Sequence, residues 1–375
     1  MAWTIGIPAE REGEPRCAIS ADVVKRYQRA GISVVVEDSL AERQPDLLEA
    51  GATQGSRQAV LTADMVCMIN PPEDGVLDGM RAGSVFVGHL APLDQPRRAE
   101  AFAKRGINAI AMELVPRISR AQKMDALSAL SSIAGYRAVL EAANALPRFF
   151  PLLTTAAGTI KPANVLVLGA GVAGLQAIAT AKRLGARVSA YDIREAVREE
   201  IQSLGATFVE LPLEMDDQQD AGGYAKALEA EKAARQVELL VPFLAKADVV
   251  ISTALIPGRP APQLISKEAV EAMSAGAVII DLAAANGGNC ALTVADTPVM
   301  HQGVKILGPT NITAGVADHA TQMYARTLMA LVLEFFDAET GTFTVNMEDE
   351  ILQGAVVTLD GSVVQPRIHS LISGA

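Results

Sequence analysis

Three glycines and an aspartate in the middle of the chain have the types and spacing that hold a dinucleotide. The glycines belong to the run Gly-Ala-Gly-Val-Ala-Gly at 169–174, which follows an apolar stretch at 165–168 and precedes a helix-like stretch at 175–181. Asp192 closes the next strand-like run, 187–191. This order of strand, glycine turn, helix, strand and acid predicts a dinucleotide site. The alternative is a tight strand-to-helix turn without a ligand.

Each glycine has a predicted mechanical role. Gly169 permits the tight turn, Gly171 lets the backbone approach a pyrophosphate without a Cβ clash, and Gly174 allows the helix to pack closely on the strand. The pyrophosphate would lie at a helix N-terminus, where unpaired N–H groups and the helix macrodipole favour an anion.

The position of Asp192 favours NAD over NADP. Its carboxylate can accept hydrogen bonds from ribose hydroxyls, and its charge would repel a 2′-phosphate. Arg194 leaves an alternative open, since it could hold a 2′-phosphate or could simply be a solvated cation at the start of a helix.

Composition excludes several other classes of protein. The net charge of −11 and the pI near 5.0 argue against nucleic acid as a direct partner, because nucleic acid requires a basic surface. The three cysteines are far apart and form no CxxC, which indicates neither a disulfide framework nor a metal site. No apolar run approaches the ~18–20 residues that span a membrane. The chain begins with a strand-like stretch, and we expect no signal peptide.

Two series of strand-like runs alternate with helical stretches, which predicts an α/β fold with two doubly wound, Rossmann-like domains and parallel sheets, linked by long helices. We expect the first domain to comprise 1–125 and 336–375, and the NAD(H)-binding domain to comprise 126–335. Apolar residues at helical spacing predict the linking helices over 125–146 and near 324–335. Asp360-Gly361 predicts a hairpin within 355–364 that packs on the first domain.

The segment 214–236 breaks this pattern because it is polar, charged and long. Two interpretations remain open: a lid over the nucleotide, or a solvated excursion rich in helix.

Several further motifs carry a family resemblance that covers nearly the whole chain. Together with the glycine turn, they resemble the NAD(H)-binding component of proton-translocating NAD(P) transhydrogenase, whose fold is shared with alanine dehydrogenase. The motifs lie at 112–125, 134–138, 155–159, 221–226, 253–258 and 287–290.

Catalytic positions separate these two activities. Alanine dehydrogenases use an Arg, a Lys, a His and an Asp, and here Arg16 and His89 match the first and third of these residues. Met68 and Ala285 stand at the positions that we match to the Lys and the Asp, and neither side chain can ionise. Oxidative deamination should therefore fail. The interpretation we favour for His89 is a packed or residual polar group.

Transhydrogenation requires no such group, because hydride passes directly between two nicotinamide rings. The resemblance assigns Gln122 to the hydride-receiving side of the nicotinamides, and Arg117, Asp125 and Ser128 to the NAD nicotinamide and its ribose. These residue types offer the donors and acceptors that a carboxamide and hydroxyls require. The alternative is that they only cap and solvate the start of the long helix.

The resemblance also implies further cofactor-binding residues. It places Val172, Asp192, Ile193, Gly223 and Leu255 in the NAD pocket, and Tyr224 on a mobile loop that closes over the cofactor. It implies no resident metal.

The activity implied by the resemblance is that of the NAD(H)-binding subunit of a Re/Si-specific, proton-translocating transhydrogenase. NADH would pass hydride to NADP+, with NADP(H) held on a partner domain, and the reaction would be coupled to proton translocation. We expect a homodimer that is cytoplasmic and peripheral to the inner membrane, which it would reach through NADP(H)-binding and membrane-spanning subunits. Two alternatives remain: an NAD-dependent amino-acid dehydrogenase of the alanine type, and a non-catalytic NAD-sensing module.

Overall fold

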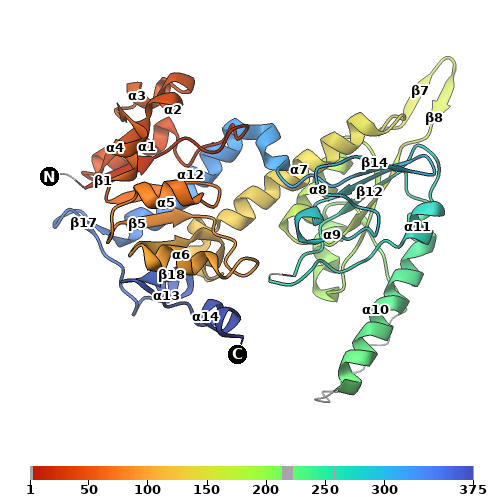
Figure 1. Cartoon of the computed structure of the whole chain (residues 1–375). Helices are drawn as coiled ribbons and strands as arrows, with labels where there is room; N and C mark the ends of the chain where they lie inside the picture. Colours follow the sequence, from red (N-terminus) through yellow and green to blue (C-terminus); the bar gives the residue numbers. More distant parts are fainter. Residues whose placement is uncertain (1–2, 213–222, 257, 375) are drawn as a thin grey trace. The chain divides into compact units, whose positions relative to one another are not determined.

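The structure is a computed structural model and describes residues 3–212, 223–256 and 258–374. The chain forms two compact units, Met1–Leu130 with Ala314–Ala375, and Ser131–Thr313 (Figure 1). Helix α12 (Ala317–Phe335), expected from the sequence in the NAD(H)-binding domain, lies instead in the first unit. The reason is its apolar face, because Tyr324 and Leu328 are buried in the core of that unit.

The first unit contains an eight-stranded sheet in which β1 to β6 are parallel and the C-terminal hairpin is antiparallel. The predicted hairpin is confirmed, and its turn residues Asp360 and Gly361 have φ of 48° and 77°. The strand order is β19 (Ser362–Val363), β18 (Val356–Leu359), β6 (Asn108–Ala111), β5 (Val85–Gly88), β4 (Met65–Cys67), β1 (Thr4–Ile7), β2 (Ser33–Glu37) and β3 (Thr53–Gly55).

Helices cover both faces of this sheet, as the alternation of side chains along β5 shows. Val85 and Val87 belong to a cluster with α1, α12 and α13, whereas Phe86 belongs to a cluster with α5, α6 and α14. Successive strand residues point to opposite faces, so each face has its own core. The remaining elements of the unit are α1 (Ala21–Arg29), α2 (Asp38–Arg43), α3 (Asp46–Glu49), α4 (Arg57–Leu61), α5 (Asp74–Gly79), α6 (Arg98–Lys104), α13 (Glu350–Ala355), α14 (Pro366–Ser373), β16 (Phe336–Asp337) and β17 (Thr342–Phe343).

The second unit repeats this design with seven strands, all parallel except β14. Val165 and Val167 of β9 (Asn164–Leu168) face a cluster with α7 and α8, and Leu166 and Leu168 face one with α10 and α11. The predicted doubly wound α/β class is thereby confirmed. The strand order is β11 (Thr207–Phe208), β10 (Arg187–Tyr191), β9 (Asn164–Leu168), β12 (Val249–Ser252), β13 (Val278–Asp281), β15 (Val304–Leu307) and β14 (Val299–His301).

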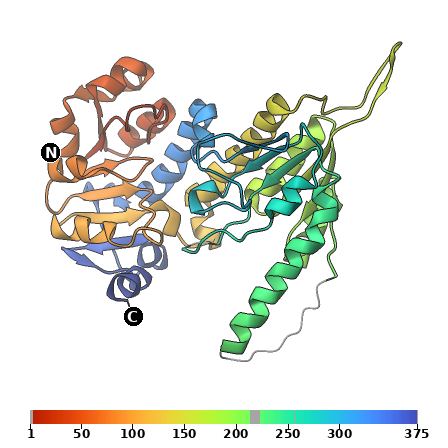
Figure 2. The ribbon, with the colours of Figure 1, turned by 45° about the vertical axis from the view of Figure 1, so that its right-hand side comes forward.

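Two features project from the second unit. Strands β7 (Leu153–Thr155) and β8 (Gly158–Ile160) form an isolated hairpin, and α10 (Gly223–Leu244) extends away from the sheet in both ribbon views (Figures 1 and 2). Helix α7 (Ala126–Ala145) begins in the first unit and continues into the second. The other helices of the second unit are α8 (Val172–Arg183), α9 (Arg198–Ser203) and α11 (Lys267–Glu271).

Candidate dinucleotide site

The glycine turn joins β9 to α8 at the carboxyl edge of the second sheet. Gly169 has φ of 94°, and a Cβ there would lie 2.7 Å from Thr253 Oγ1. A Cβ on Gly174 would lie 1.9 Å from the carbonyl oxygen of Gly169. The fold itself therefore requires glycine at both positions.

Gly171 differs from the other two glycines. It is the N-cap residue of α8 with φ of −78°, a value open to any residue, and a Cβ there would meet no atom within 4 Å. Nothing in the described structure requires glycine here. The space in front of Gly171 is open, at a helix N-terminus whose first N–H groups favour an anion.

One close contact behind the turn was not singled out from the sequence. A Cβ on Gly135 of α7 would lie 2.0 Å from the carbonyl oxygen of Ala173, in the first turn of α8. Gly135 thus allows α7 to support the helix whose N-terminus faces the open space. The sequence does not predict a close contact of this kind, because it depends on how α7 and α8 pack against each other.

Asp192 lies directly after β10, beside the glycine turn. Its carboxylate accepts hydrogen bonds from the backbone N–H of Ala170 at 2.8 Å and from the backbone N–H of Arg194 at 2.8 Å. The guanidinium of Arg194 adds two bonds, from Nε at 3.0 Å and from Nη2 at 2.9 Å. Burial acts to raise the pKa of Asp192, but the hydrogen bonds from Arg194 and Ala170 outweigh it, so the pKa is lowered. Asp192, the predicted ribose acceptor, therefore favours its ionised form and is already hydrogen-bonded by Arg194.

Exposed apolar side chains surround the turn at the carboxyl ends of three adjacent strands. Val172 follows β9, Ile193 follows β10 and Leu255 follows β12, with exposures of 38%, 63% and 51%. In open α/β sheets ligands bind at the carboxyl ends of the strands, where the strand order reverses. The three predicted pocket residues thus share the edge that also carries Gly171 and Asp192.

The loop that carries Leu255 is held by a buried side chain that the sequence alone did not identify. The Oδ1 atom of Asn289 accepts hydrogen bonds from Ser252 Oγ and from the N–H of Ala254, and its Nδ2 donates to the carbonyl oxygens of Ala254 and Pro262. Asn289 is completely buried. Its four hydrogen bonds make it a support of the site rather than a part of its surface.

Two predicted residues lie at the start of α10. Gly223 and Tyr224 form its first turn. The preceding segment of the proposed lid, 213–222, lies outside the described residues. From residue 223 onward the segment is helical, which agrees with the interpretation of a helix-rich excursion for that stretch.

The predicted nicotinamide residues lie in the first unit, around the 3₁₀ helix Ser119–Met124. Ala121 and Met124 are buried and anchor this helix, whereas Arg117 and Gln122 are exposed and make no side-chain hydrogen bond with any described residue. Asp125 caps α7, accepting from Ser128 N at 2.8 Å and Ser128 Oγ at 2.6 Å. In this structure Asp125 and Ser128 therefore agree with the capping interpretation. The exposed side chains of Arg117 and Gln122 are available to contact a ligand.

The residues that match the dehydrogenase pattern are engaged in the interior of the first unit. Arg16 is buried and forms two hydrogen bonds to Glu14, Nε–Oε1 at 2.7 Å and Nη2–Oε2 at 2.6 Å. Burial acts to raise the pKa of Glu14, but Arg16 outweighs it and lowers the value to about 2. Asn70 Nδ2 joins the pair at 3.1 Å, whereas Met68 packs in the apolar core. The uncharged residue facing this pair is therefore Asn70 rather than Met68.

The imidazole of His89 has an acidic neighbour near Nδ1, but its Nε2 has no hydrogen-bond partner among the described residues. Its Nδ1 lies 3.6 Å from Glu113 Oε2, and its Nε2 is buried without a hydrogen bond to any described residue. The ring packs 5.3 Å from that of Tyr324. These contacts agree with the interpretation of a packed residual group.

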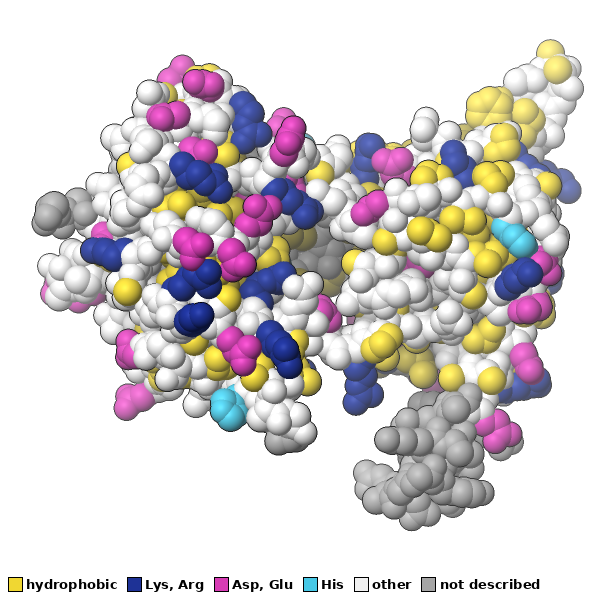
Figure 3. Space-filling view, in the orientation of Figure 1, with side chains coloured by type: hydrophobic (Ala, Val, Ile, Leu, Met, Phe, Trp, Pro, Cys, Tyr) yellow, Lys and Arg dark blue, Asp and Glu magenta, His cyan; other side chains and the backbone are white. Residues whose placement is uncertain are grey.

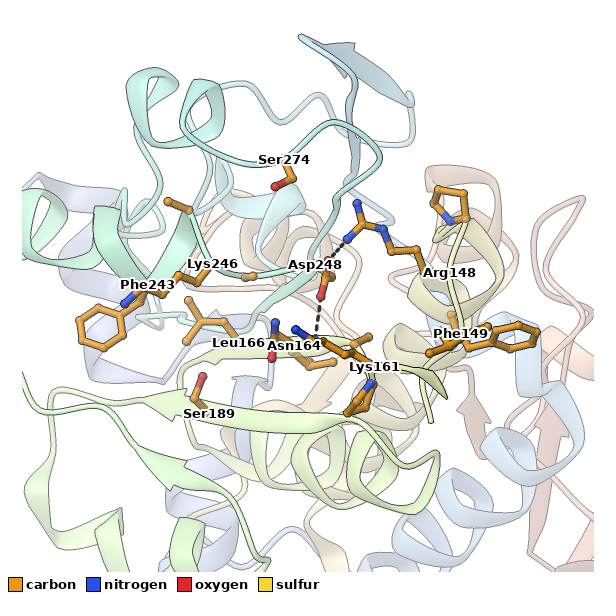
Figure 4. Close-up of a pocket in the computed structure, with 18 residues that line it drawn as sticks. Arg148, Phe149, Lys161, Asn164, Leu166, Ser189, Phe243, Lys246, Asp248 and Ser274 are labelled. Carbon is orange, nitrogen blue, oxygen red and sulfur yellow. Dashed lines mark hydrogen bonds and ion pairs between the residues drawn. The ribbon is translucent and has the colours of Figure 1, made fainter. Parts of the chain in front are cut away.

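A cavity of about 1170 Å³ in the second unit lies at the other edge of the sheet. Figure 4 shows Asp248 between the side chain of Arg148 and the backbone N–H of Asn164, where β9 and β12 begin. Because dinucleotides bind at the carboxyl edge, this cavity is not the predicted site.

The described residues of the chain hold no group of three or more His, Cys, Asp or Glu side chains arranged to bind a metal ion. Among the helices that the structure describes, none is long and apolar enough to cross a membrane.

The arrangement defines a protein of two doubly wound units, one of which presents a dinucleotide-type glycine turn. The sequence matches the family described as alanine dehydrogenase/PNT, N-terminal domain, over residues 6–134 and its C-terminal domain over residues 138–366. The chain belongs to the alanine dehydrogenase/PNT family.

Within this family the chain is similar in sequence and in structure to transhydrogenases. It is 46% identical to an NAD(P) transhydrogenase subunit alpha protein of Rhodospirillum rubrum, over 97% of this chain and 98% of that protein. It is 40% identical to NAD(P) transhydrogenase subunit alpha of Haemophilus influenzae, over 96% of this chain and 72% of that protein. The transhydrogenase structure from Sinorhizobium meliloti superposes with a TM-score of 0.87 at 37% identity and covers 96% of this chain and 100% of that one. The predicted family is confirmed.

Proposed function

We propose that this chain binds NAD(H) on its second unit and takes part in hydride transfer between NADH and NADP+ held on a partner domain. The observation that carries the proposal is Gly171. Close contacts within the fold require glycine at 169 and 174, whereas no described residue lies near a Cβ at Gly171, which supports a role for Gly171 in letting a ligand approach the backbone. Asp192, at the same edge, supports NAD over NADP.

Transhydrogenation is favoured over amino-acid oxidation because the residues at the matching positions do not provide the groups that such oxidation needs. Such oxidation needs a free cation for the substrate carboxylate and a group that manages the amine protons. Arg16 is neutralised by Glu14, and Asn70, Met68 and Ala285 cannot ionise. The two nicotinamides supply the hydride chemistry when they are bound, so the chain has only to orient the rings and exclude water.

The residues that would orient the NAD nicotinamide are Arg117, Gln122, Asp125 and Ser128. The side chains of Arg117 and Gln122, which make no hydrogen bond with any described residue, suit a carboxamide and the neighbouring ring. Asp125 and Ser128 would exchange their mutual hydrogen bond for the ribose hydroxyls. Val172, Ile193 and Leu255 would cover the adenosine and its ribose, and Gly223 and Tyr224 would close over the cofactor.

The complete enzyme would be a Re/Si-specific, proton-translocating transhydrogenase. NADP(H)-binding and membrane-spanning subunits would couple hydride transfer to proton movement and hold this chain at the cytoplasmic side of the inner membrane. A homodimer is supported by the β7–β8 hairpin and the segment just before it, where Phe149, Leu152 and Ile160 are exposed by 54%, 59% and 45%. Apolar side chains on a projecting hairpin are typical of a contact with a second copy.

The test mixes the purified chain with an NADP(H)-binding transhydrogenase domain and follows reduction of an NAD analogue by NADPH. We expect Gln122→Asn to lower the rate at least tenfold with little change in NADH affinity. Gln58→Asn, at an exposed glutamine on α4, is the matched control and should leave both unchanged. Alanine-dependent reduction of NAD+ by the chain alone would instead establish the dehydrogenase alternative. NADH binding without any transfer would favour a sensing module.

A further inference from the structure

The first unit has a cavity of about 930 Å³ that the proposed hydride transfer does not use. It lies at the carboxyl ends of β1 and β4, lined by residues that include Arg11, Asn70 and Pro71. These two strands are neighbours in the sheet, and the chain order reverses between them. This is the topological switch point, the place where doubly wound sheets bind their ligands.

Four arginines line this cavity: Arg11, Arg57, Arg97 and Arg98. Arg57 is paired with Glu37, and Arg98 donates to the carbonyl oxygen of Leu90 and to Gln95. The side chains of the two others, Arg11 and Arg97, are exposed and make no hydrogen bond or ion pair with any residue that the structure describes. Figure 3 shows Lys and Arg side chains, with Asp and Glu among them, on the face of the first unit that carries α5 and α6.

The carboxylates of the cavity do not cancel this charge. Asp74 is paired with Arg105, and Glu10 is buried with its oxygens occupied by the N–H groups of Ile69 and Asn70. Burial raises the pKa of Glu10, which disfavours its negative form. The lining then contains one further carboxylate, that of Glu73, together with the arginines Arg11, Arg97 and Arg98. The cavity is therefore positive in a chain whose net charge is −11.

Part of the cavity wall is apolar. Met68, Val76 and Leu77 line it and are buried within the core of this face of the sheet, and Pro71 and Pro72 add rigid apolar surface. The volume lies within the range of ~300–1,000 Å³ that small organic ligands occupy. Inorganic phosphate would leave most of this space and all of the apolar lining unused.

We propose that this cavity binds an organic oxyanion, a phosphate monoester or a carboxylate with an apolar body, through Arg11 and Arg97. Guanidinium groups bind both oxyanions with two parallel hydrogen bonds, so the two sources share one chemistry. The apolar body would lie on Met68, Val76 and Leu77. The site lies wholly in the first unit and does not depend on NAD(H) binding by the second.

The test uses calorimetry on the full chain with saturating NADH, so that the nucleotide site is filled. Phenyl phosphate and phthalate are the two oxyanion probes, phenol supplies the apolar body alone, and inorganic phosphate supplies the charge alone. We expect at least one aromatic oxyanion to bind one site per chain, at least tenfold more tightly than phenol or inorganic phosphate. The probe that binds more tightly identifies the class of ligand: phenyl phosphate indicates a phosphate monoester, and phthalate indicates a carboxylate.

The double variant Arg11→Ser/Arg97→Ser should weaken that binding at least tenfold. Arg26→Ser/Arg29→Ser, at exposed arginines of α1 in the same unit, is the matched control and should bind as the unchanged chain does. If the double variant does not fold, Arg97→Ser alone serves, with an expected loss of at least threefold. Equal binding by variant and control, or no saturable binding of either oxyanion, overturns the proposal. Failure of NADH to bind would overturn the proposed function but leave this test intact.

Discussion

Replacing Gly171 with alanine separates the needs of the fold from the needs of a ligand. In the structure the added methyl group meets no atom within 4 Å, and φ of −78° suits alanine. As an N-cap residue, alanine destabilises the helix relative to glycine by up to ~1 kcal/mol. Alanine also restricts the unfolded chain, which stabilises the folded state by about 0.4–1 kcal/mol. We therefore expect the free energy of unfolding to change by less than about 1 kcal/mol.

The effect of Gly171→Ala on binding should be much larger. A pyrophosphate at this helix N-terminus accepts charge-assisted hydrogen bonds from backbone N–H groups, each contributing about 1.5–3 kcal/mol. A methyl group that holds the anion away removes at least one of them. NADH should therefore bind about 10- to 100-fold more weakly, as measured by quenching of protein fluorescence or by calorimetry.

Gly174→Ala is the contrasting variant, since its Cβ would lie 1.9 Å from the backbone oxygen of Gly169. It should lose roughly 3 kcal/mol or more of stability, because the backbone atoms in its way cannot move without shifting the turn. Unchanged NADH affinity in a folded Gly171→Ala protein would refute the assignment of this turn. A large loss of stability in that variant would show that the open space in front of Gly171 is filled by the chain itself.

Three further predictions concern charge and assembly. Arg194→Gln frees acceptor positions on Asp192. Because the guanidinium of Arg194 is exposed to solvent, its ion pair with Asp192 contributes at most ~1 kcal/mol, and NADH should bind up to about fivefold more tightly; weaker binding by calorimetry would mean that Arg194 contacts the dinucleotide. The pKa of Glu14 is depressed from its usual 4.5 to about 2, so its contribution of about 3 kcal/mol is present above pH 4.5 and lost as the pH falls from there toward 2. Denaturant unfolding between pH 2 and 5 should show this loss in the unchanged chain, and Glu14→Gln/Arg16→Met should lack it. Leu152→Ser/Ile160→Ser should shift the mass measured by light scattering from dimer toward monomer without changing the melting temperature by more than a few degrees; a monomeric unchanged chain would contradict the dimer.

The elements that the sequence predicted correctly are those specified by local pattern. The apolar run ending at Leu168, the glycine turn and the hairpin at Asp360-Gly361 each depend on residues close together in the chain. The supports of the site are different, because Asn289 lies 35 residues from Ala254, whose N–H and C=O it binds. Gly135 and Ala173 meet across two helices. Such contacts have no periodic signal, and only the folded sheet brings their partners together.

Arg16 shows that a residue matching a catalytic pattern is weak support for an activity until the residues it contacts are known. Considered alone, it matches the arginine of the alanine dehydrogenases and would suggest a carboxylate substrate. In the structure Glu14 is completely buried beside it, and removing one member of such a pair would leave an uncompensated buried charge that costs about 3–5 kcal/mol. The fold thus has its own reason to keep Arg16. The proposed chemistry depends instead on Asn70 and Ala285, which cannot ionise, and on Arg117 and Gln122, whose side chains make no hydrogen bond with any residue that the structure describes.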